Sequence, residues 1–265
     1  MRSLLFIPGD SPKKLDKGVT SGADAIIVDL EDAISPERKA QARDITLAYL
    51  KQVQPLKNRP QLMVRVNGLQ TGLTDADLDV IVAGKPDAIM LPKAEGGVAV
   101  THCDAKLAAR EAMHGLAEGS IKIVTIATET AQALFLAGTF ANSSPRLTGL
   151  TWGAEDISAE IGAETNRDAQ GNFLDLYRLA RSLCLAGAGL GGKRSDHGLG
   201  LGDGFSVRRE HLIDDRNLRG MDRHLAGESV AAGFLAFAAQ ARVVAVIHID
   251  RVDRLDFRGS GASEA

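Results

Sequence analysis

Short apolar runs alternate with helical patterns along the first 186 residues of the chain. Each run has a length typical of a buried strand. The runs are residues 3–8, 25–30, 62–66, 87–91, 121–127 and 147–152. Six β–α units in succession predict a parallel sheet, either doubly wound or closed into a (β/α)8 barrel.

Helix signals lie between the apolar runs. Serine precedes proline at Ser11–Pro12 and at Ser35–Pro36, as at the N-terminus of a helix. Thr74 with Asp77 resembles a capping box in which Asp replaces the usual Glu. Residues 172–186 carry apolar side chains at helical spacing and predict a further helix.

Charged side chains follow most of the predicted strands. Burying a charge at such a position is costly unless it has a partner. The residues concerned are Asp29, Glu31, Asp32, Arg65, Lys93, Glu95, Glu129, Glu155 and Asp156. Barrel sites gather at the carboxyl ends of the strands, so this pattern favours the barrel, although a doubly wound sheet also binds ligands at that edge.

Composition narrows the class of protein. Of the 265 residues 45% are hydrophobic but only 4% aromatic, so Ala, Val, Ile and Leu build the core. Lys and Arg (31) nearly balance Asp and Glu (34), which argues against a nucleic-acid partner. No run approaches a membrane span, and the N-terminus lacks signal-peptide features. Cys103 and Cys184 show no metal spacing, and we expect a cytoplasmic protein.

Glu129 and Asp156 follow neighbouring strands of the predicted barrel. Their carboxylates could converge on one Mg²⁺, which prefers oxygen ligands and retains several waters. Alternatively, both acids could sit at helix N-termini, where the helix dipole favours negative charge. The pattern alone leaves these two interpretations about even.

Arg65 lies within an apolar alternation and needs a charged partner. A carboxylate or enolate of a substrate would serve, and so would Asp29 or Glu31. Asp29, Glu31 and Asp32 cannot all face the barrel interior from one strand. Lys93 could hold an anionic group or neutralise Glu95.

Six segments resemble, in order, the HpcH/HpaI aldolase and citrate lyase family, and more closely its citrate lyase beta-subunit-like CoA-ester lyases. They are "RSLLFIPGD", "GADAIIVDLEDAI", "VRVNG", "DAIMLPKAE", "IATETA" and "GLTWGAEDIS". The resemblance covers about residues 1–186. It implies a TIM barrel of the phosphoenolpyruvate/pyruvate superfamily type that uses Mg²⁺, or Mn²⁺, and acts on CoA thioesters.

The implied reaction cleaves or forms a carbon–carbon bond in a 3-hydroxyacyl-CoA ester, such as malyl-CoA, citramalyl-CoA or a citryl thioester. Cleavage would give acetyl-CoA and a 2-oxo acid. A malyl-CoA thioesterase is a close alternative. A catalytically impaired protein that binds a 2-oxo acid or a CoA metabolite is another. The resemblance also implies a homo-oligomer, a trimer or hexamer, if the barrel closes.

The resemblance assigns roles to individual positions. Glu129 and Asp156 become the metal ligands and, with Arg65, the catalytic residues. Further substrate contacts are implied for Arg2, Lys14 and the segment Gly153, Ala154 and Glu155. Asp29, Glu31 and Asp32 are implied to support this arrangement, with Glu31 and Asp32 near the water shell of the metal.

Residues 187–265 depart from the family. The glycine-rich segment 187–204 predicts a flexible linker, and the family segments "QAIDTVYTDYRD" and "GFTGKMAIHP" are missing from the forward sequence. Codons for residues 220–229, read on the complementary strand, can encode the second of these segments, and codons for 244–255 can encode a close variant of the first. We hypothesise that the coding DNA after about residue 190 is inverted. The tail is then expected to be partly disordered, although residues 230–241 and 243–249 could still form a helix and a strand.

Overall fold

The computed structural model describes residues 3–191 and 244–246, and it contains one parallel sheet. The six predicted apolar runs correspond to the first six strands. The strands are β1 (Leu4–Pro8), β2 (Ala25–Asp29), β3 (Gln61–Arg65), β4 (Ala88–Leu91), β5 (Lys122–Ile126), β6 (Leu147–Thr151) and β7 (Val244–Val246). Each strand pairs in parallel with the next along the chain, so the sheet runs from β1 to β7.

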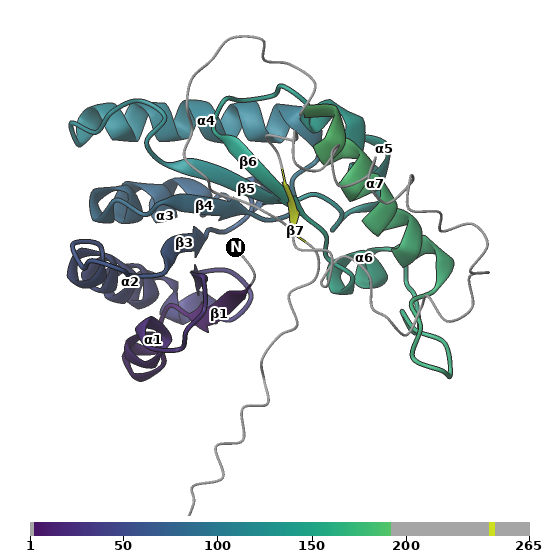
Figure 1. Cartoon of the computed structure of the whole chain (residues 1–265), viewed down its shortest axis with the longest axis horizontal. Helices are drawn as coiled ribbons and strands as arrows, with labels where there is room; N and C mark the ends of the chain where they lie inside the picture. Colours follow the sequence, from purple (N-terminus) through teal and green to yellow (C-terminus); the bar gives the residue numbers. More distant parts are fainter. Residues whose placement is uncertain (1–2, 192–243, 247–265) are drawn as a thin grey trace, which may run out of the picture.

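Helices connect the strands and cover the outer face of the curved sheet (Figure 1). The α-helices are α1 (Pro12–Val19), α2 (Lys39–Val53), α3 (Thr74–Ile81), α4 (Gly96–Met113), α5 (Ala131–Phe135), α6 (Glu155–Glu160) and α7 (Asp175–Gly191). Short 3-10 turns are η1 (Pro36–Arg38), η2 (Leu69–Thr71), η3 (Val82–Gly84) and η4 (Ala137–Phe140). This is the order of a TIM barrel, and within the described residues the sheet does not close.

The two faces of the sheet are buried separately. A large core lies between the sheet and the helices and includes Ile26 and Val28 of β2. A smaller cluster on the opposite face includes Ala25 and Ile27. Because side chains alternate along a strand, Asp29 faces the same side as Ala25 and Ile27. The interior of the curved sheet therefore changes from apolar to charged at the carboxyl end of β2.

The predicted helix starts at the two Ser-Pro pairs are confirmed, because Pro12 begins α1 and Pro36 begins η1 directly before α2. The predicted capping box is wrong. Thr74 lies inside the first turn of α3, and its hydroxyl donates to the carbonyl oxygen of Asn67. The Asp77 carboxylate accepts hydrogen bonds from Asn67 and Arg43 instead of from the start of its own helix. These two side chains fasten the loop after β3.

The predicted helix at 172–186 is α7, and it continues to Gly191. Residues 187–191 were expected to begin a linker, and that expectation is wrong. A Cβ atom at Gly187 would lie 2.5 Å from the carbonyl oxygen of Ala137, so glycine here permits close packing of α7 on η4. The rest of the proposed linker and the proposed helix at 230–241 lie outside the described residues, whereas β7 falls within the proposed strand at 243–249.

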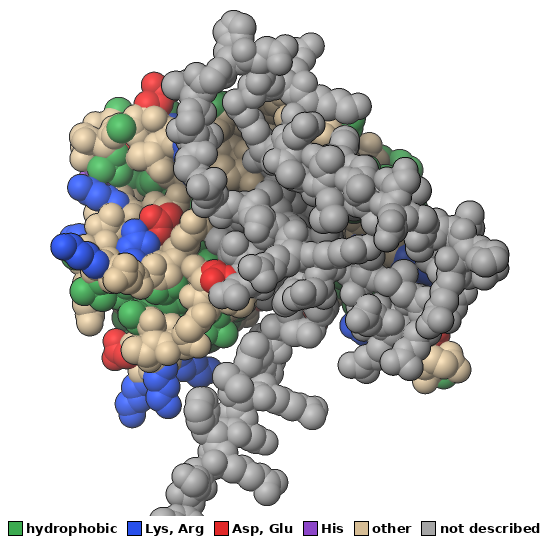
Figure 2. Space-filling view, in the orientation of Figure 1, with side chains coloured by type: hydrophobic (Ala, Val, Ile, Leu, Met, Phe, Trp, Pro, Cys, Tyr) green, Lys and Arg blue, Asp and Glu red, His purple; other side chains and the backbone are tan. Residues whose placement is uncertain are grey.

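The outer surface over α1 to α4 mixes basic, acidic and apolar side chains on the face seen in Figure 2. This agrees with the near balance of charges in the sequence. In the part of the chain that the structure describes, none of the helices has the length and hydropathy to cross a bilayer.

Candidate active site

Arg65 ends β3 directly opposite Asp29 in the register of the sheet. Its Nε and Nη2 atoms donate to the two Asp29 carboxylate oxygens at 2.8 and 2.6 Å. Its Nη1 atom lies 2.9 Å from Glu31 Oε2, and the guanidinium stands 5.0 Å from the centre of the Phe6 ring. Burial would lower the pKa of Arg65, but the hydrogen bonds and charge of Asp29 outweigh it and raise that pKa. Arg65 is therefore a permanently charged group held by its two acidic neighbours.

Asp29 also shapes the loop after β2. One of its carboxylate oxygens accepts the backbone N–H of Glu31 at 2.9 Å. From the other side, the Lys39 ammonium donates to the carbonyl oxygens of Leu30 and Glu31 at 2.8 and 2.7 Å. Asp29 and Lys39 thus hold the backbone of this loop from two sides, and the Glu31 side chain points into the interior of the curved sheet. Burial raises the pKa of Glu31, and the nearby charges of Arg65 and Lys93 oppose this rise.

The backbone of Lys93 adopts a left-handed conformation, with φ at +50°, in the loop after β4. Its N–H donates to Glu129 Oε2 at 2.5 Å, and its carbonyl oxygen accepts from Gln70 Nε2 at 3.0 Å. Non-glycine residues adopt this conformation infrequently, and such residues cluster at functional sites. The unusual backbone geometry thus directs the Lys93 N–H at Glu129.

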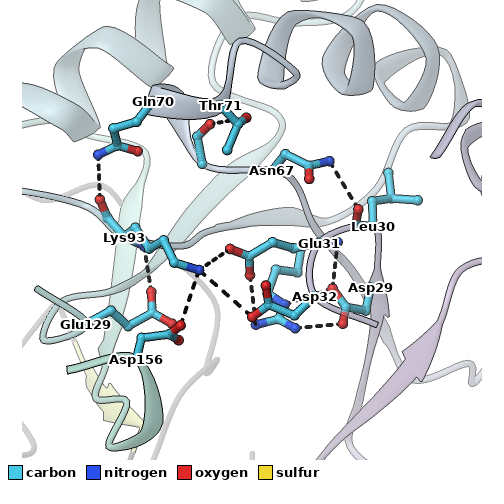
Figure 3. A network of polar contacts seen from close by, with 12 residues as sticks. Asp29, Leu30, Glu31, Asp32, Asn67, Gln70, Thr71, Lys93, Glu129 and Asp156 are labelled. Carbon is cyan, nitrogen blue, oxygen red and sulfur yellow. Dashed lines mark hydrogen bonds and ion pairs between the residues drawn. The ribbon is translucent and has the colours of Figure 1, made fainter. Parts of the chain in front are cut away.

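The Lys93 ammonium joins two groups of acids (Figure 3). It donates to Glu31 Oε1 at 2.6 Å, and it lies 3.9 Å from Asp32 Oδ2 on the same loop. In the opposite direction it is 3.5 Å from Asp156 Oδ1. The pKa of Lys93 is raised, because the hydrogen bond and charge of Glu31 outweigh the effect of burial. Lys93 therefore connects the end of β2 with the ends of β5 and β6.

Glu129 and Asp156 come together beyond β5 and β6 (Figure 3). Glu129 is only 3% exposed, and its pKa is raised well above the usual range, first by burial and then by the neighbouring Asp156 charge. A Cβ atom at Gly153 would lie 3.0 Å from Glu129 Cγ, so the missing side chain makes room for this carboxylate. Helix capping does not explain Glu129, because Thr130 caps α5 by accepting from Ala133 N. Asp156 does lie in the first turn of α6.

Most of the predicted site residues gather at this edge of the sheet. Those brought together are Asp29, Glu31, Asp32, Arg65, Glu129, Gly153 and Asp156. Ala154 precedes α6 and Glu155 is exposed at its start. Lys14 is exposed on α1, and Arg2 lies outside the described residues.

The sequence-based predictions gave two residues of this site too little weight. Lys93 was expected to hold a phosphate or carboxylate, or to neutralise Glu95, and the carboxylates that it holds are those of Glu31 and Asp156. Its position directly after a predicted strand was the available signal. Lys39, which holds the loop after β2, follows a helix start, and the predictions from the sequence assigned it no role.

The donor set fits a magnesium ion. Within residues 3–191 and 244–246, no three His, Cys, Asp or Glu side chains form a complete metal-ligand cluster. The adjacent Glu129 and Asp156 carboxylates supply two oxygen ligands and leave the other positions to water and substrate, which is the usual way in which proteins hold Mg²⁺. The buried Glu129 carboxylate, crowded by a second acid, is also a group that a dication would stabilise.

The fold and these strand-end residues define a parallel β/α protein with its polar site at the carboxyl edge of the sheet. The chain belongs to the HpcH/HpaI aldolase/citrate lyase family, whose model matches residues 2–192.

The relatives of this chain include thioesterases and lyases. The (3S)-malyl-CoA thioesterase of Cereibacter sphaeroides is 35% identical over 167 residues, which are 63% of this chain and 53% of the relative. Citrate lyase subunit beta of Leuconostoc mesenteroides is 32% identical over 169 residues, or 64% and 55% of the two chains. The chain thus spans about half the length of these relatives. The thioesterase of another C. sphaeroides strain is 33% identical over 231 residues, which are 86% of this chain and 72% of that relative. This alignment is long enough to extend beyond α7.

Solved structures share the fold. The citrate lyase beta subunit of Mycobacterium tuberculosis, complexed with oxaloacetate and magnesium, has a TM-score of 0.57 and 27% identity, covering 92% of this chain and 90% of that one. The protein CitE of M. tuberculosis, in complex with magnesium, acetoacetate and coenzyme A, has a TM-score of 0.57 and 26% identity, covering 92% and 75%.

The raised pKa of Glu129 predicts how stability depends on pH. The folded state favours the neutral form of Glu129. The stability that Glu129 contributes is therefore complete below its pKa in the unfolded chain, and it is lost as pH rises through its pKa in the folded protein. Glu129→Gln cannot ionise. In metal-free buffer we expect this variant to melt at least about 2 °C above the wild type at pH 8, with the difference vanishing near pH 4. Thermal unfolding followed by circular dichroism measures it.

Glu118→Gln, which changes an exposed acid, serves as the control and should follow the wild type at every pH. A Glu129→Gln variant less stable than the wild type at pH 8 would show that Glu129 is ionised and stabilising in the metal-free protein.

Proposed function

We propose that this protein is a Mg²⁺-dependent carbon–carbon lyase that cleaves or forms a 3-hydroxyacyl-CoA ester, such as malyl-CoA, citramalyl-CoA or a citryl thioester. The products of cleavage are acetyl-CoA and a 2-oxo acid. The observation that carries the proposal is the pairing of Glu129 and Asp156 at one edge of the sheet, linked through Lys93 and Glu31 to Arg65. The names of the relatives and the magnesium, oxo acids and coenzyme A of the M. tuberculosis structures support it.

Glu129 and Asp156 would hold the ion, and Glu31 and Asp32 would orient water around it. A bound Mg²⁺ supplies Lewis-acid polarisation of the oxo-acid oxygen. Mn²⁺ is an alternative with the same ligand preferences. Gly153 lies beside Glu129, and the backbone of residues 153–155 would contact the oxo acid.

Arg65 would stabilise the charge that develops on the thioester. In cleavage, the hydroxyl of the ester loses its proton and becomes the 2-oxo group as the carbon–carbon bond breaks. The electron pair of that bond stays on the acetyl thioester as an enolate, which takes up a proton to give acetyl-CoA. Arginine has five N–H donors, and Asp29 accepts from only Nε and Nη2, while Nη1 faces Glu31. The remaining donors are therefore available to substrate. Because Asp29 fixes the guanidinium plane, Arg65 needs little reorganisation when charge develops.

Hydrolysis of a malyl-CoA thioester is the second candidate, because a 35% identical relative is named as such a thioesterase. Product analysis separates the two activities. A lyase converts malyl-CoA to acetyl-CoA and glyoxylate, whereas a thioesterase gives malate and free CoA. Failure of the protein to turn over any of these esters while binding a 2-oxo acid would favour the impaired binding protein.

Three further features belong to the same proposal. Arg2 and Lys14 would contact substrate or the phosphates of CoA. The protein would assemble as a homo-oligomer, a trimer or hexamer, if the barrel closes. It would act in the cytoplasm.

Asp156→Asn tests the metal site with little change in shape. The amide cannot supply an anionic ligand, so we expect Mg²⁺-dependent binding of pyruvate or oxaloacetate to fall below detection in calorimetric titration. Asp79→Asn, an exposed change on α3, should bind like the wild type. Unchanged titration of Asp156→Asn would remove Asp156 from the proposed ligands.

Arg65→Lys tests the role of the guanidinium. The substitution keeps the charge but loses the planar fork, so we expect kcat/KM for the productive ester to fall at least about 100-fold, the scale of losing one oxyanion donor. Arg59→Lys is a matched control, because Arg59 also makes a two-pronged pair, with Asp87, just before the amino ends of β3 and β4. A loss of only a few-fold for Arg65→Lys would instead favour a purely structural ion pair with Asp29.

A further inference from the structure

Lys93 occupies a backbone position at which glycine would be the unstrained choice. Its φ of +50° is unfavourable for a residue with a Cβ atom, yet a lysine stands there. Hydrogen bonds to Glu129 and from Gln70 hold its peptide groups in this conformation. A glycine would provide the same backbone contacts, so the lysine side chain itself is what this position adds to the site.

The charges around this side chain do not balance. Five carboxyl groups meet at the edge of the sheet, together with the cations of Arg65 and Lys93, while the Lys39 ammonium is bound to the backbone of the loop that carries Glu31. The acids are Asp29, Glu31, Asp32, Glu129 and Asp156. Arg65 is committed to Asp29 and Glu31. Among the ion pairs of the described residues, Lys93 supplies the cation that lies beside Asp156.

The contacts of the Lys93 ammonium with Glu31 and with Asp156 are unequal. The distance to Glu31 Oε1 is 2.6 Å, a strong charge-assisted hydrogen bond, whereas the distance to Asp156 Oδ1 is 3.5 Å. A dication that reached Asp156 would need to displace only the longer contact. Lys93 could then remain on Glu31, close to the incoming charge.

We propose that Lys93 is an internal counter-cation that stands in for the metal at Asp156 when the site is empty and weakens metal binding by competing for that carboxylate. The inference rests on the metal site of the proposed function, and it adds that Lys93 sets the affinity of that site for Mg²⁺. Lys93 holds the acids together without metal, because like charges this close repel each other. When Mg²⁺ binds, the ammonium stays on Glu31 and leaves Asp156 to the ion. The site thereby remains assembled between metal-free and metal-bound states.

The test measures Mg²⁺ binding to the full chain by isothermal titration calorimetry, without substrate. Lys93→Met keeps the length of the side chain and removes its charge. We expect it to bind Mg²⁺ at least about tenfold more tightly than the wild type, because a nearby positive charge is gone. Lys93→Arg keeps the charge and should bind within about threefold of the wild type. Lys106→Met, which breaks an ion pair with Asp75 away from the site, should leave the affinity unchanged.

Thermal unfolding gives a second readout that does not depend on activity. Lys93→Met should melt below the wild type without metal and gain more from added Mg²⁺, because stabilisation by a ligand grows with its affinity. If Lys93→Met is unfolded by circular dichroism, Lys93→Gln, which can still donate to Glu31, takes its place.

Equal or weaker Mg²⁺ binding by Lys93→Met would overturn the inference and leave the proposed function intact. Tighter binding by both Lys93→Met and Lys93→Arg would also overturn it, since charge would not be the cause. Absence of Mg²⁺ binding in the wild type and all variants would contradict the metal site and the proposed function together.

Discussion

The buried ion pair between Arg65 and Asp29 is the contact on which the rest of the site depends. The two residues end neighbouring strands in direct register, so the parallel sheet itself brings them together. Either charge alone would be costly at this depth, and removing one partner of a buried pair is strongly destabilising. Asp29 also binds the N–H of Glu31, so the same carboxylate orients the guanidinium and sets the course of the loop after β2. The geometry of the candidate site and the local folding thus depend on one interaction.

From that pair, alternating charges continue across the edge of the sheet. Glu31 contacts Arg65 on one side and Lys93 on the other, and Lys93 reaches Asp156 through its ammonium and Glu129 through its backbone N–H. Acids from three strand ends can stay close only because cations are interleaved among them. The remaining excess of negative charge is the physical reason to expect that this arrangement would attract a dication.

The sequence predicted the strands and the edge at which the site lies, because apolar runs and the charges that follow them are local signals. It could not choose partners for Arg65 and Lys93, since these depend on strand register and on the left-handed turn at Lys93. The capping box predicted at Thr74 does not form, because its two side chains bind the loop after β3 instead. Thr74 donates to the carbonyl oxygen of Asn67, and Asp77 accepts from the Asn67 N–H. The end of α7 was missed because glycine at position 187 indicated a linker. In the structure this glycine allows close contact with Ala137, which is far away in the sequence. The inverted-DNA hypothesis for the tail concerns mainly residues outside those described and stays a prediction.

The central claim is that Glu129 and Asp156 hold one divalent ion within this network. Its most direct test is a crystal structure of the full chain grown with Mn²⁺, with anomalous diffraction used to locate the metal. The account predicts one anomalous peak at this edge of the sheet, with an oxygen of Glu129 and an oxygen of Asp156 each about 2.1 Å away, as expected for octahedral oxygen coordination. A fully occupied peak elsewhere, with these two carboxylates turned away from each other, would contradict it.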